Sequence, residues 1–374
     1  MKKGWNKYNL MDICNVSTGK HDANHAVENG KYRFYTCSSQ YVFCNTKRFE
    51  GECIILPGNG VNVGETYYYN GDFDAYQRTY VIDKIDNRII PMFLYYHFQN
   101  NWRSEGVAKQ YGSATNYIKI GNFKDYIVNA PQSLSEQQSI VDYLDSSFAK
   151  IDAMKVNAEK ALNEAKALFQ ASLKEMLEPK EGWEEKKLQD VARDFSRGKS
   201  KHRPRNDKKL FGGKYPFIQT GEIRNSNVYV TSHSSTYNEL GLSQSKLWPE
   251  DTVCITIAAN IAEVAILKYP SCFPDSVIGF VADNNKVDKL FVYYSILNYQ
   301  QELKKQGKGS AQDNINLGTF EKNKFPFPSL QEQQSIVATL DSIKSKVDRL
   351  QENFDKISQE CDALKQAILR QVFE

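Results

Sequence analysis

The C-terminal stretch 329–374 carries the feature that most constrains this fold, an uninterrupted heptad pattern. From Gln331 onward, apolar residues recur at alternating steps of four and three, as expected for one face of a long coiled-coil helix. The predicted seam comprises Ile336, Leu340, Ile343, Val347, Leu350, Phe354, Ile357, Cys361, Leu364 and Ile368. A helix with such a seam must bury it against a second helix, so the pattern predicts a partner.

The partner helix lies earlier in the same chain. Ser-Glu-Gln-Gln-Ser-Ile-Val at 135–141 recurs almost unchanged as Gln-Glu-Gln-Gln-Ser-Ile-Val at 331–337, and Ser133 and Ser329 each open a Ser-x-x-Glu capping box there. The repeat predicts a first long helix that ends before Pro179. In the phase of the second helix, its seam comprises Ile140, Leu144, Ser147, Ile151, Met154, Ala158, Ala161, Ala165, Leu168 and Ser172.

We predict that the two helices pair antiparallel within one chain. A parallel pair would require the intervening region to carry the chain back along a whole helix, roughly 65 Å at 1.5 Å per residue. The intervening region has about 145 residues, and a domain of this length has a radius of gyration of about 15 Å, which is too small for this return. Small residues such as Ala158 and Ala161 also leave room for Phe354 and Leu350. Pairing between two copies of the chain is the alternative.

Two mixed, strand-rich regions alternate with the helices. In the first, glycine and asparagine turns separate short strand-like segments, and one helical stretch lies near 92–99. The strand-like segments are 31–36, 53–56, 66–69 and 79–82. The sequence thus predicts an α+β protein with pseudo-two-fold symmetry. The predicted order is domain 1–132, helix 133–179, domain 180–328 and helix 329–374.

The second strand-rich region restarts the first. Gly4-Trp5 aligns with Gly182-Trp183, and Gly19-Lys20 aligns with Gly198-Lys199. A Gly-Ser-Ala segment followed by Ile-x-Ile-Gly or Ile-x-Leu-Gly then ends each region. The loops between these anchors differ, above all the Lys- and Arg-rich stretch after Lys199. Drift after duplication is the alternative, but it would also erode the helix starts. We interpret the chain as one scaffold used twice with two recognition surfaces.

Composition indicates a globular protein suited to contact with a polyanion. The net charge is only +3, yet residues 135–178 hold eight acids and five bases and residues 331–374 hold eight acids and six bases, so the basic surplus lies outside the helices. Seven dispersed cysteines without a Cys-x-x-Cys pair indicate free thiols in a reducing cytoplasm. No apolar run has membrane length and no signal-peptide core begins the sequence, so we expect no membrane association.

The sequence offers no motif for catalysis. A methyltransferase acting on DNA bases needs a glycine-rich cofactor loop and an Asn/Asp-Pro-Pro-aromatic motif, and neither occurs. Gly198-Lys199-Ser200 resembles the end of a phosphate-binding loop, but Arg193 replaces its first glycine. Pro274-Asp275 lacks the spacing of a nuclease core, and the histidines lack metal-ligand spacing with cysteines. We therefore expect no catalytic residue, no metal site and no cofactor in this chain.

Candidate DNA contacts are cations, which can reach phosphates or guanine edges, and Asn and Gln, which suit adenine. The densest basic segment, 197–205, contains Pro and Gly and is expected to form a loop. For each candidate, a solvated or turn-forming role is the alternative. The candidates of the first region are Lys20, His21, Lys47, Arg48, Asn62, Arg78, Lys109, Gln110 and Asn116. Those of the second are Arg197, Lys199, Lys201, His202, Arg203, Arg205, Arg224, Lys308, Gln312 and Asn314.

Four repeated features together resemble the specificity subunit of type I restriction–modification systems. They are the Gly-Trp-x4-Leu openings, the Gly-Ser-Ala segments, the Glu-Gln-Gln-Ser-Ile-Val helix starts, and the helix ends at 173–177 and 369–373. The resemblance implies that residues 1–130 and 182–328 are target recognition domains, each reading half of an interrupted, asymmetric DNA site. The sequence as given starts directly at the first of them, without a preceding helical segment.

The same resemblance implies the partners. The two helices would set the spacer between half-sites and dock two modification subunits, which methylate adenine with S-adenosylmethionine. Two restriction subunits, which are ATP- and Mg-dependent motors with a nuclease, would join them. A self-standing DNA-binding regulator that dimerises through its coil is one alternative, and it predicts a homodimer active alone. A scaffold protein is another, and it predicts no salt-sensitive DNA binding.

Overall fold

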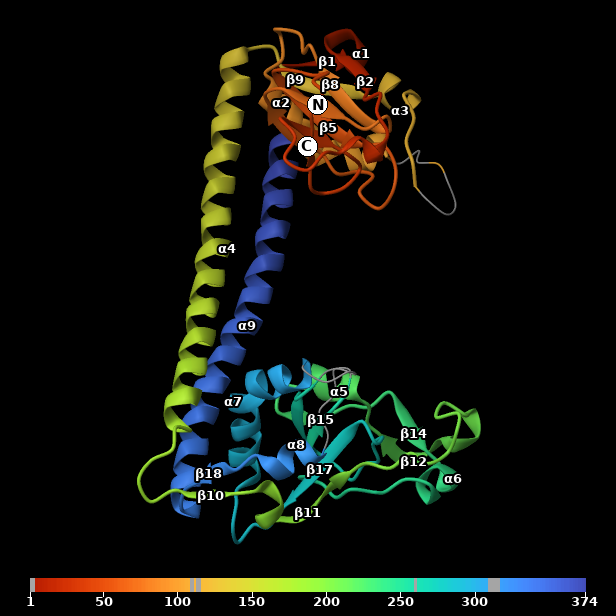
Figure 1. The fold of residues 1–374 in the computed structure, drawn as a ribbon. Helices are drawn as coiled ribbons and strands as arrows, with labels where there is room; N and C mark the ends of the chain where they lie inside the picture. Colours follow the sequence, from red (N-terminus) through yellow and green to blue (C-terminus); the bar gives the residue numbers. More distant parts are fainter. Residues whose placement is uncertain (1–3, 108–110, 112–115, 259–260, 309–316) are drawn as a thin grey trace. The chain divides into compact units, whose positions relative to one another are not determined.

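The computed structural model describes residues 4–107, 111, 116–258, 261–308 and 317–374 (Figure 1). The chain divides into two units, each combining one strand-rich region with parts of both long helices. Unit 1 comprises residues 1–159 and 353–374, and unit 2 comprises residues 160–352. The boundaries predicted at residues 132, 179 and 328 treat the helices as separate modules, and that division stays a prediction.

Unit 1 is built on a four-stranded antiparallel sheet in the order β2-β8-β5-β6, accompanied by a three-stranded sheet, β4-β3-β7, and the pair β1-β9. Its strands are β1 Trp5–Asn9, β2 Asn15–Thr18, β3 Tyr32–Tyr35, β4 Val42–Cys44, β5 Glu52–Pro57, β6 Tyr67–Asn70, β7 Phe73–Ala75, β8 Thr79–Asp83 and β9 Ile127–Pro131. Its short helices are α1 Leu10–Ile13, η1 Ala23–His25, α2 Pro91–Asn101, η2 Trp102–Gly106 and α3 Gly121–Lys124. The predicted strand-like segments correspond to β3, β5, β6 and β8, and the predicted helix is α2, so these predictions are confirmed.

Unit 2 is built on a five-stranded sheet in the order β11-β17-β15-β16-β13, with the pairs β12-β14 and β10-β18. Its strands are β10 Glu184–Lys186, β11 Ala192–Arg197, β12 Phe211–Phe217, β13 Tyr229–Val230, β14 Ser235–Tyr237, β15 Val253–Thr256, β16 Val264–Leu267, β17 Val277–Ala282 and β18 Phe325–Phe327. Its other helices are η3 Leu188–Asp190, η4 Lys208–Leu210, α5 Thr220–Asn225, α6 Glu239–Ser243, α7 Lys289–Lys308 and α8 Leu317–Lys322.

The two units repeat one topology. The order β2-β8-β5-β6 of unit 1 returns as β11-β17-β15-β16 in unit 2, and the pair β1-β9 returns as β10-β18. In both units, the repeated Gly-Trp opening packs at the start or end of a long helix. Trp5 stacks edge-on to Phe93 and Phe373, whereas the indole N–H of Trp183 donates to Glu332 at 3.2 Å. The internal duplication predicted from the sequence is therefore a duplication of fold.

The two long helices are α4 Leu134–Met176 and α9 Leu330–Phe373. Both begin where the capping boxes predict, because the hydroxyl of Ser133 accepts from the N–H of Glu136 at 3.4 Å and that of Ser329 accepts from the N–H of Glu332 at 3.3 Å. α4 ends at Met176, before Pro179, as predicted.

The helices run antiparallel where they meet within each unit. In unit 1, Lys365 pairs with Asp152 at 2.6 Å and Asp362 pairs with Lys155 at 3.8 Å, so three residues forward on α4 match three residues back on α9. In unit 2, the ammonium of Lys166 donates to Gln351 at 2.8 Å. The intramolecular antiparallel pairing predicted from the seams is confirmed.

The predicted face of α4 is partly wrong. Leu144 and Ile151 are buried, and Ile140 and Ala158 are half-buried, as predicted. However, Met154 is 58% exposed and Leu168 is 62% exposed. Ala161 on α4 and Leu364 on α9 are exposed as well. The remaining predicted α9 positions are buried or half-buried, namely Ile336, Leu340, Ile343, Val347, Leu350, Phe354, Ile357, Cys361 and Ile368.

The physical reason for this correction is that α4 packs against more than its helical partner. Leu162 and Phe169, each one residue beyond a predicted position, are buried instead of Ala161 and Leu168. Phe169 lies 6.3 Å, centre to centre, from the ring of Tyr294 on α7, within the main core of unit 2. The strand-rich region therefore helps to select the buried face of α4. The predicted seam of α4 assumes the heptad phase of α9, which takes no account of this packing.

Candidate nucleic-acid interface

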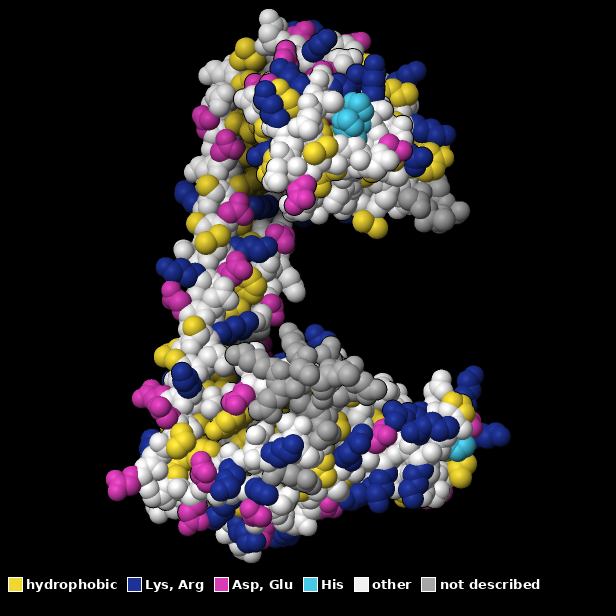
Figure 2. All heavy atoms as spheres, viewed as in Figure 1, with side chains coloured by type: hydrophobic (Ala, Val, Ile, Leu, Met, Phe, Trp, Pro, Cys, Tyr) yellow, Lys and Arg dark blue, Asp and Glu magenta, His cyan; other side chains and the backbone are white. Residues whose placement is uncertain are grey.

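The basic segment of unit 2 forms a loop between β11 and η4, as predicted. Figure 2 shows Lys and Arg side chains gathered on unit 2, over the part of Figure 1 that contains β12, β14 and α6. The loop is held to α6 and its surroundings by its own polar groups. The N–H of His202 donates to Gln244 at 3.0 Å, and the imidazole of His202 lies 2.9 Å from Asp207. A backbone N–H bond from Lys209, together with His202, lowers the pKa of Asp207.

The three arginines that were predicted as DNA contacts in this loop are also bound within the protein. Arg197 donates to the carbonyl of Asp275 at 2.8 Å, and Arg205 pairs with the carboxylate of Asp275 at 2.7 Å. Arg203 donates to the carbonyl of His202 at 2.8 Å. These arginines order the loop. Lys199 and Lys201 are exposed, and no ion pair joins either ammonium group to a described residue.

Arg224 is exposed on α5, a short helix. The segment Gly221-Glu222-Ile223-Arg224 is helical because the carboxylate of Glu222 accepts from the N–H of Gln219 at 3.0 Å and caps the first turn. Lys109, Gln110, Gln312 and Asn314 lie outside the described residues, as does the side chain of Lys308. Asn116 is exposed, and its carbonyl accepts from Gly60 at 2.8 Å.

The candidates of unit 1 differ in how they are held. Lys47 lies 2.8 Å from both Glu50 and Asp72, and these acids raise its pKa. Arg48 is exposed and donates to the carbonyl of Thr18 at 3.2 Å. The side-chain amide of Asn62 is used locally, since it donates to the carbonyl of Cys37 at 2.8 Å. Lys20 and Arg78 are exposed, and no ion pair or hydrogen bond joins either side chain to a described residue.

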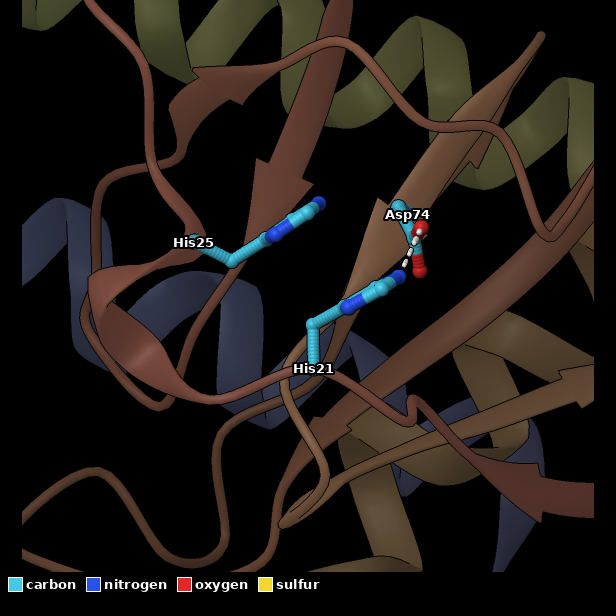
Figure 3. A group of neighbouring side chains, drawn as sticks. All are labelled: His21, His25 and Asp74. Atoms are coloured by element: carbon cyan, nitrogen blue, oxygen red, sulfur yellow. Dashed lines mark ion pairs between the residues drawn. The ribbon is translucent and has the colours of Figure 1, made fainter.

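His21 belongs to a cluster that the sequence did not predict (Figure 3). The rings of His21 and His25 stack at 3.7 Å with 5° between their planes, and His21 lies 3.6 Å from the carboxylate of Asp74. One ligand atom from each residue falls within 4.8 Å of the others. The spacing of histidines and cysteines could not reveal this group, because its third member is an aspartate on β7, and the expectation of no metal site stays a prediction.

The arrangement of this cluster favours a structural role. Metal ligation needs imidazole nitrogens whose ring planes converge on one point, whereas the parallel planes of His21 and His25 do not converge. Asp74 is only 1% exposed and accepts from Thr46 at 2.6 Å, and Thr46 also lies 2.8 Å from His25. The hydrogen-bonded network thus anchors the loop after β2 on a buried carboxylate.

A cavity of about 410 Å³ in unit 1 brings Arg78 together with residues that the sequence did not single out. Asn59 and Gln77 line it with Arg78, and the rings of Tyr80 and Tyr117 form part of its wall. No short motif joins these positions, because they come from three separate segments of the chain. Only the side-by-side strands β5 and β8 bring the first two segments together.

The described part of the chain contains no helix long and apolar enough to cross a membrane. All seven cysteines are free thiols.

Comparison with known proteins agrees with these features. The family model for the type I restriction modification DNA specificity domain matches residues 2–164 and 180–359. The specificity subunit of the type I restriction enzyme EcoDI from Escherichia coli is 36% identical over 169 residues, which cover 45% of this chain and 37% of that protein. A Mycoplasma pneumoniae protein named as a type I specificity subunit is 25% identical over 346 residues, covering 90% of this chain and 88% of that protein.

Solved structures show the same fold. A chain from a study of complex assembly and conformational transition in a type I restriction–modification system matches with a TM-score of 0.77 and 18% identity, covering 100% of this chain and 98% of that chain. The HsdS subunit of Thermoanaerobacter tengcongensis matches with a TM-score of 0.58 and 16% identity, covering 99% and 97%. The matched family supplies DNA sequence specificity and is non-catalytic. Because its model matches both halves, this chain belongs to the type I restriction–modification DNA specificity family.

Proposed function

We propose that this chain is the DNA-specificity subunit of a type I restriction–modification complex, and that each strand-rich region reads one half of a bipartite, asymmetric DNA site. The observation that carries the proposal is one fold used twice with different surfaces. The sheets β2-β8-β5-β6 and β11-β17-β15-β16 correspond, but the basic loop after Gly198 has no counterpart after Gly19. Equivalent frames with different loops suit the reading of two different half-sites.

Affinity for DNA would come mainly from cationic side chains that form no ion pair with a described residue. Lys199 and Lys201 in unit 2, and Lys20 in unit 1, are exposed and suit contacts to phosphates. Arg197, Arg203 and Arg205 would act by ordering the loop. The other predicted contacts, including those outside the described residues, are also proposed to bind DNA.

The long helices would set the distance between half-sites and dock two modification subunits, to which two restriction subunits add. Support comes from apolar side chains that the α4–α9 pairing leaves exposed. In unit 1, Tyr143 is 50% exposed and Met154 lies three turns further on the same face. In unit 2, Leu168 on α4 is exposed. Apolar side chains spaced along one helix suit a helical partner.

S-adenosylmethionine, ATP and Mg would bind to those partner subunits. We place the complex in the cytoplasm, which the seven free thiols support.

The decisive experiment is methylome sequencing of cells that express this chain with and without its cognate methyltransferase subunit. The expected result is a bipartite methyladenine motif that appears only when both are present. Absence of such a motif in both cultures, together with a stable homodimer that binds DNA alone, would support the dimeric regulator instead. Absence of any salt-sensitive DNA binding would support a scaffold.

A further inference from the structure

A tight turn in unit 1 presents two polar side chains at its tip. Tyr76, Gln77, Arg78 and Thr79 form a β-turn, in which the N–H of Thr79 donates to the carbonyl of Tyr76 at 2.8 Å. Gln77 and Arg78 occupy its two central positions, and both are exposed. No hydrogen bond or ion pair joins either side chain to a described residue. The turn thus displays an amide and a guanidinium that have no polar partner in the part of the chain that the structure describes.

Two glycines hold this turn in place from both sides. A Cβ atom on Gly19 would lie 1.6 Å from the carbonyl oxygen of Ala75, and a Cβ on Gly58 would lie 2.1 Å from that of Arg78. The N–H of Gly58 donates to the same carbonyl of Arg78 at 2.9 Å. Contacts this close leave no room for a side chain at either glycine position. The turn is therefore held as a rigid support for its two tip side chains.

The turn forms one side of the cavity of about 410 Å³. Gln77 and Arg78 face it together with Asn59, whose side chain also has no hydrogen-bond partner among the described residues. Tyr80 and Tyr117 add aromatic surface. A volume of this size lies in the range of small-ligand sites, and amide groups beside aromatic rings suit the edge and face of a nucleobase.

Unit 2 carries the same turn with different tip residues. The N–H of Val277 donates to the carbonyl of Pro274 at 3.1 Å, which places Asp275 and Ser276 at the tip. Gly198 donates to Val277 at 2.8 Å, as Gly19 does to Thr79 at 3.4 Å. The backbone of the turn is therefore duplicated, while its tip changes from Gln-Arg to Asp-Ser.

The tip of the second turn takes part in the basic surface of unit 2. Asp275 holds Arg205 through its carboxylate and Arg197 through its carbonyl. The turn tip has the same backbone in both units but different side chains, and in unit 2 it lies next to the basic loop. A position of this kind can distinguish one DNA sequence from another.

We propose that the turn Tyr76–Thr79, with Asn59, is the base-reading element of unit 1 and receives one purine, and that the turn Pro274–Val277 holds the equivalent position in unit 2. The amides of Gln77 and Asn59 each offer the donor and acceptor that match adenine N6 and N7. The guanidinium of Arg78 then contacts an adjacent phosphate or guanine edge. This inference rests on the proposed function and adds to it the residues that choose a base.

The test uses the full chain with its methyltransferase partner and compares Gln77→Ala and Asn59→Ala with the wild type by methylome sequencing. We expect one purine position in one half-site to become degenerate, with discrimination at that position reduced by about 5- to 150-fold. The other half-site stays unchanged. Asp275→Asn is expected to alter only that other half-site.

Asn87→Ala is the matched control, because Asn87 is an exposed amide of unit 1 that does not line the cavity. It is expected to leave both half-sites as in the wild type. Hydrogen exchange of β5 and β8 in each variant separates misfolding from altered reading.

The inference is overturned if folded Gln77→Ala and Asn59→Ala enzymes keep the wild-type motif. It is also overturned if they weaken binding to every DNA sequence equally. If the wild-type chain itself yields no bipartite motif, the proposed function fails, and this outcome is distinct from a failure of the turn.

Discussion

Gln137 on α4 and Gln333 on α9 occupy the same position in the two units, and each fastens the start of its helix to the adjoining strand-rich region. The two side chains are 0% and 1% exposed. Each accepts one backbone N–H bond at 2.9 Å and donates to two backbone carbonyls. The partners are Ile90, Arg88 and Pro131 in unit 1, and Asp288, Lys286 and Pro328 in unit 2. This geometry accounts for the first glutamine of the repeated Glu-Gln-Gln sequence.

Replacing either glutamine with alanine should destabilise its own unit. Gln137→Ala removes this partner from three backbone groups, one buried and two partly buried, so we expect a loss of about 2–4 kcal/mol in the unfolding free energy of unit 1. Hydrogen exchange at the amide of Ile90 measures the local effect, and Gln333→Ala should do the same at Asp288. The neighbouring exposed residues give matched controls, Gln138→Ala and Gln334→Ala. Equal effects of buried and exposed substitutions would contradict this account.

Two adjacent residues of α4 should differ strongly in their contribution to stability. Phe169→Ala removes a ring from the core of unit 2 and should cost about 3–5 kcal/mol of unfolding free energy. Leu168→Ala changes an exposed side chain and should stay within about 0.5 kcal/mol. Denaturant unfolding of the two variants compares them directly. If Leu168→Ala were the more destabilising, the heptad phase predicted from the sequence would be right after all.

Acid should weaken unit 1 through His97. Its Nε2 atom accepts from the backbone N–H of Asn129 at 3.2 Å and is therefore unprotonated. Burial lowers the pKa of His97 to about 3. The unfolded chain binds this proton near pH 6.5, so His97 does not lower the unfolding free energy of unit 1 above that pH. As the pH falls from there towards 3, this free energy decreases by up to about 1.4 kcal/mol per pH unit.

Ser295 follows Tyr294 in unit 2 as His97 follows Tyr96 in unit 1, so unit 2 serves as an internal control. Hydrogen exchange at pH 7 and pH 5, corrected for intrinsic rates, should show the larger loss of protection in β9 than in β18. An equal loss in both strands would argue against a specific role of His97.

Lysines of the basic loop should affect affinity but not sequence preference. Lys199→Ala and Lys201→Ala should each weaken binding to all DNA sequences and reduce the slope of log affinity against log salt by about one. Titration of DNA with the assembled complex at several salt concentrations measures both quantities. Lys186→Ala is the control, because this lysine already pairs with Glu184 at 2.7 Å. A changed half-site in the Lys199 variant would instead indicate base contact.

Shortening the helical pair should change the spacer. Removing residues 156–162 together with 355–361 preserves the antiparallel register, because the pairs Lys155–Asp362 and Lys166–Gln351 flank the deletion. Seven residues of helix correspond to about 10 Å, so we expect a spacer shorter by about three base pairs with both half-sites unchanged. Selection from a random-spacer DNA library provides the measurement. An unchanged spacer in a folded variant would remove the helices from this role.

The heptad steps after Gln331, the repeated helix starts and the two capping serines were enough to predict both long helices, their antiparallel pairing and the duplicated order of the chain. Each of these features depends on residues a few positions apart, or on a direct comparison of two similar segments. The candidate DNA contacts were less predictable, since the sequence cannot show that Arg203 is bound within its own loop and that Arg205 pairs with Asp275, whereas no ion pair joins Lys199 to a described residue.

The tertiary structure alone decided which face of α4 is buried, what the repeated glutamines bind, and which side chains meet at the turn between β7 and β8. Phe169 is buried in place of Leu168 because it packs against α7, and Gln77 and Asn59 line one cavity because β5 and β8 pair. Local periodicity determines that a helix or strand forms. The face that it buries, and the neighbours of each polar group, depend on the packing of segments distant in sequence, where hydrogen bonding and burial are optimised together.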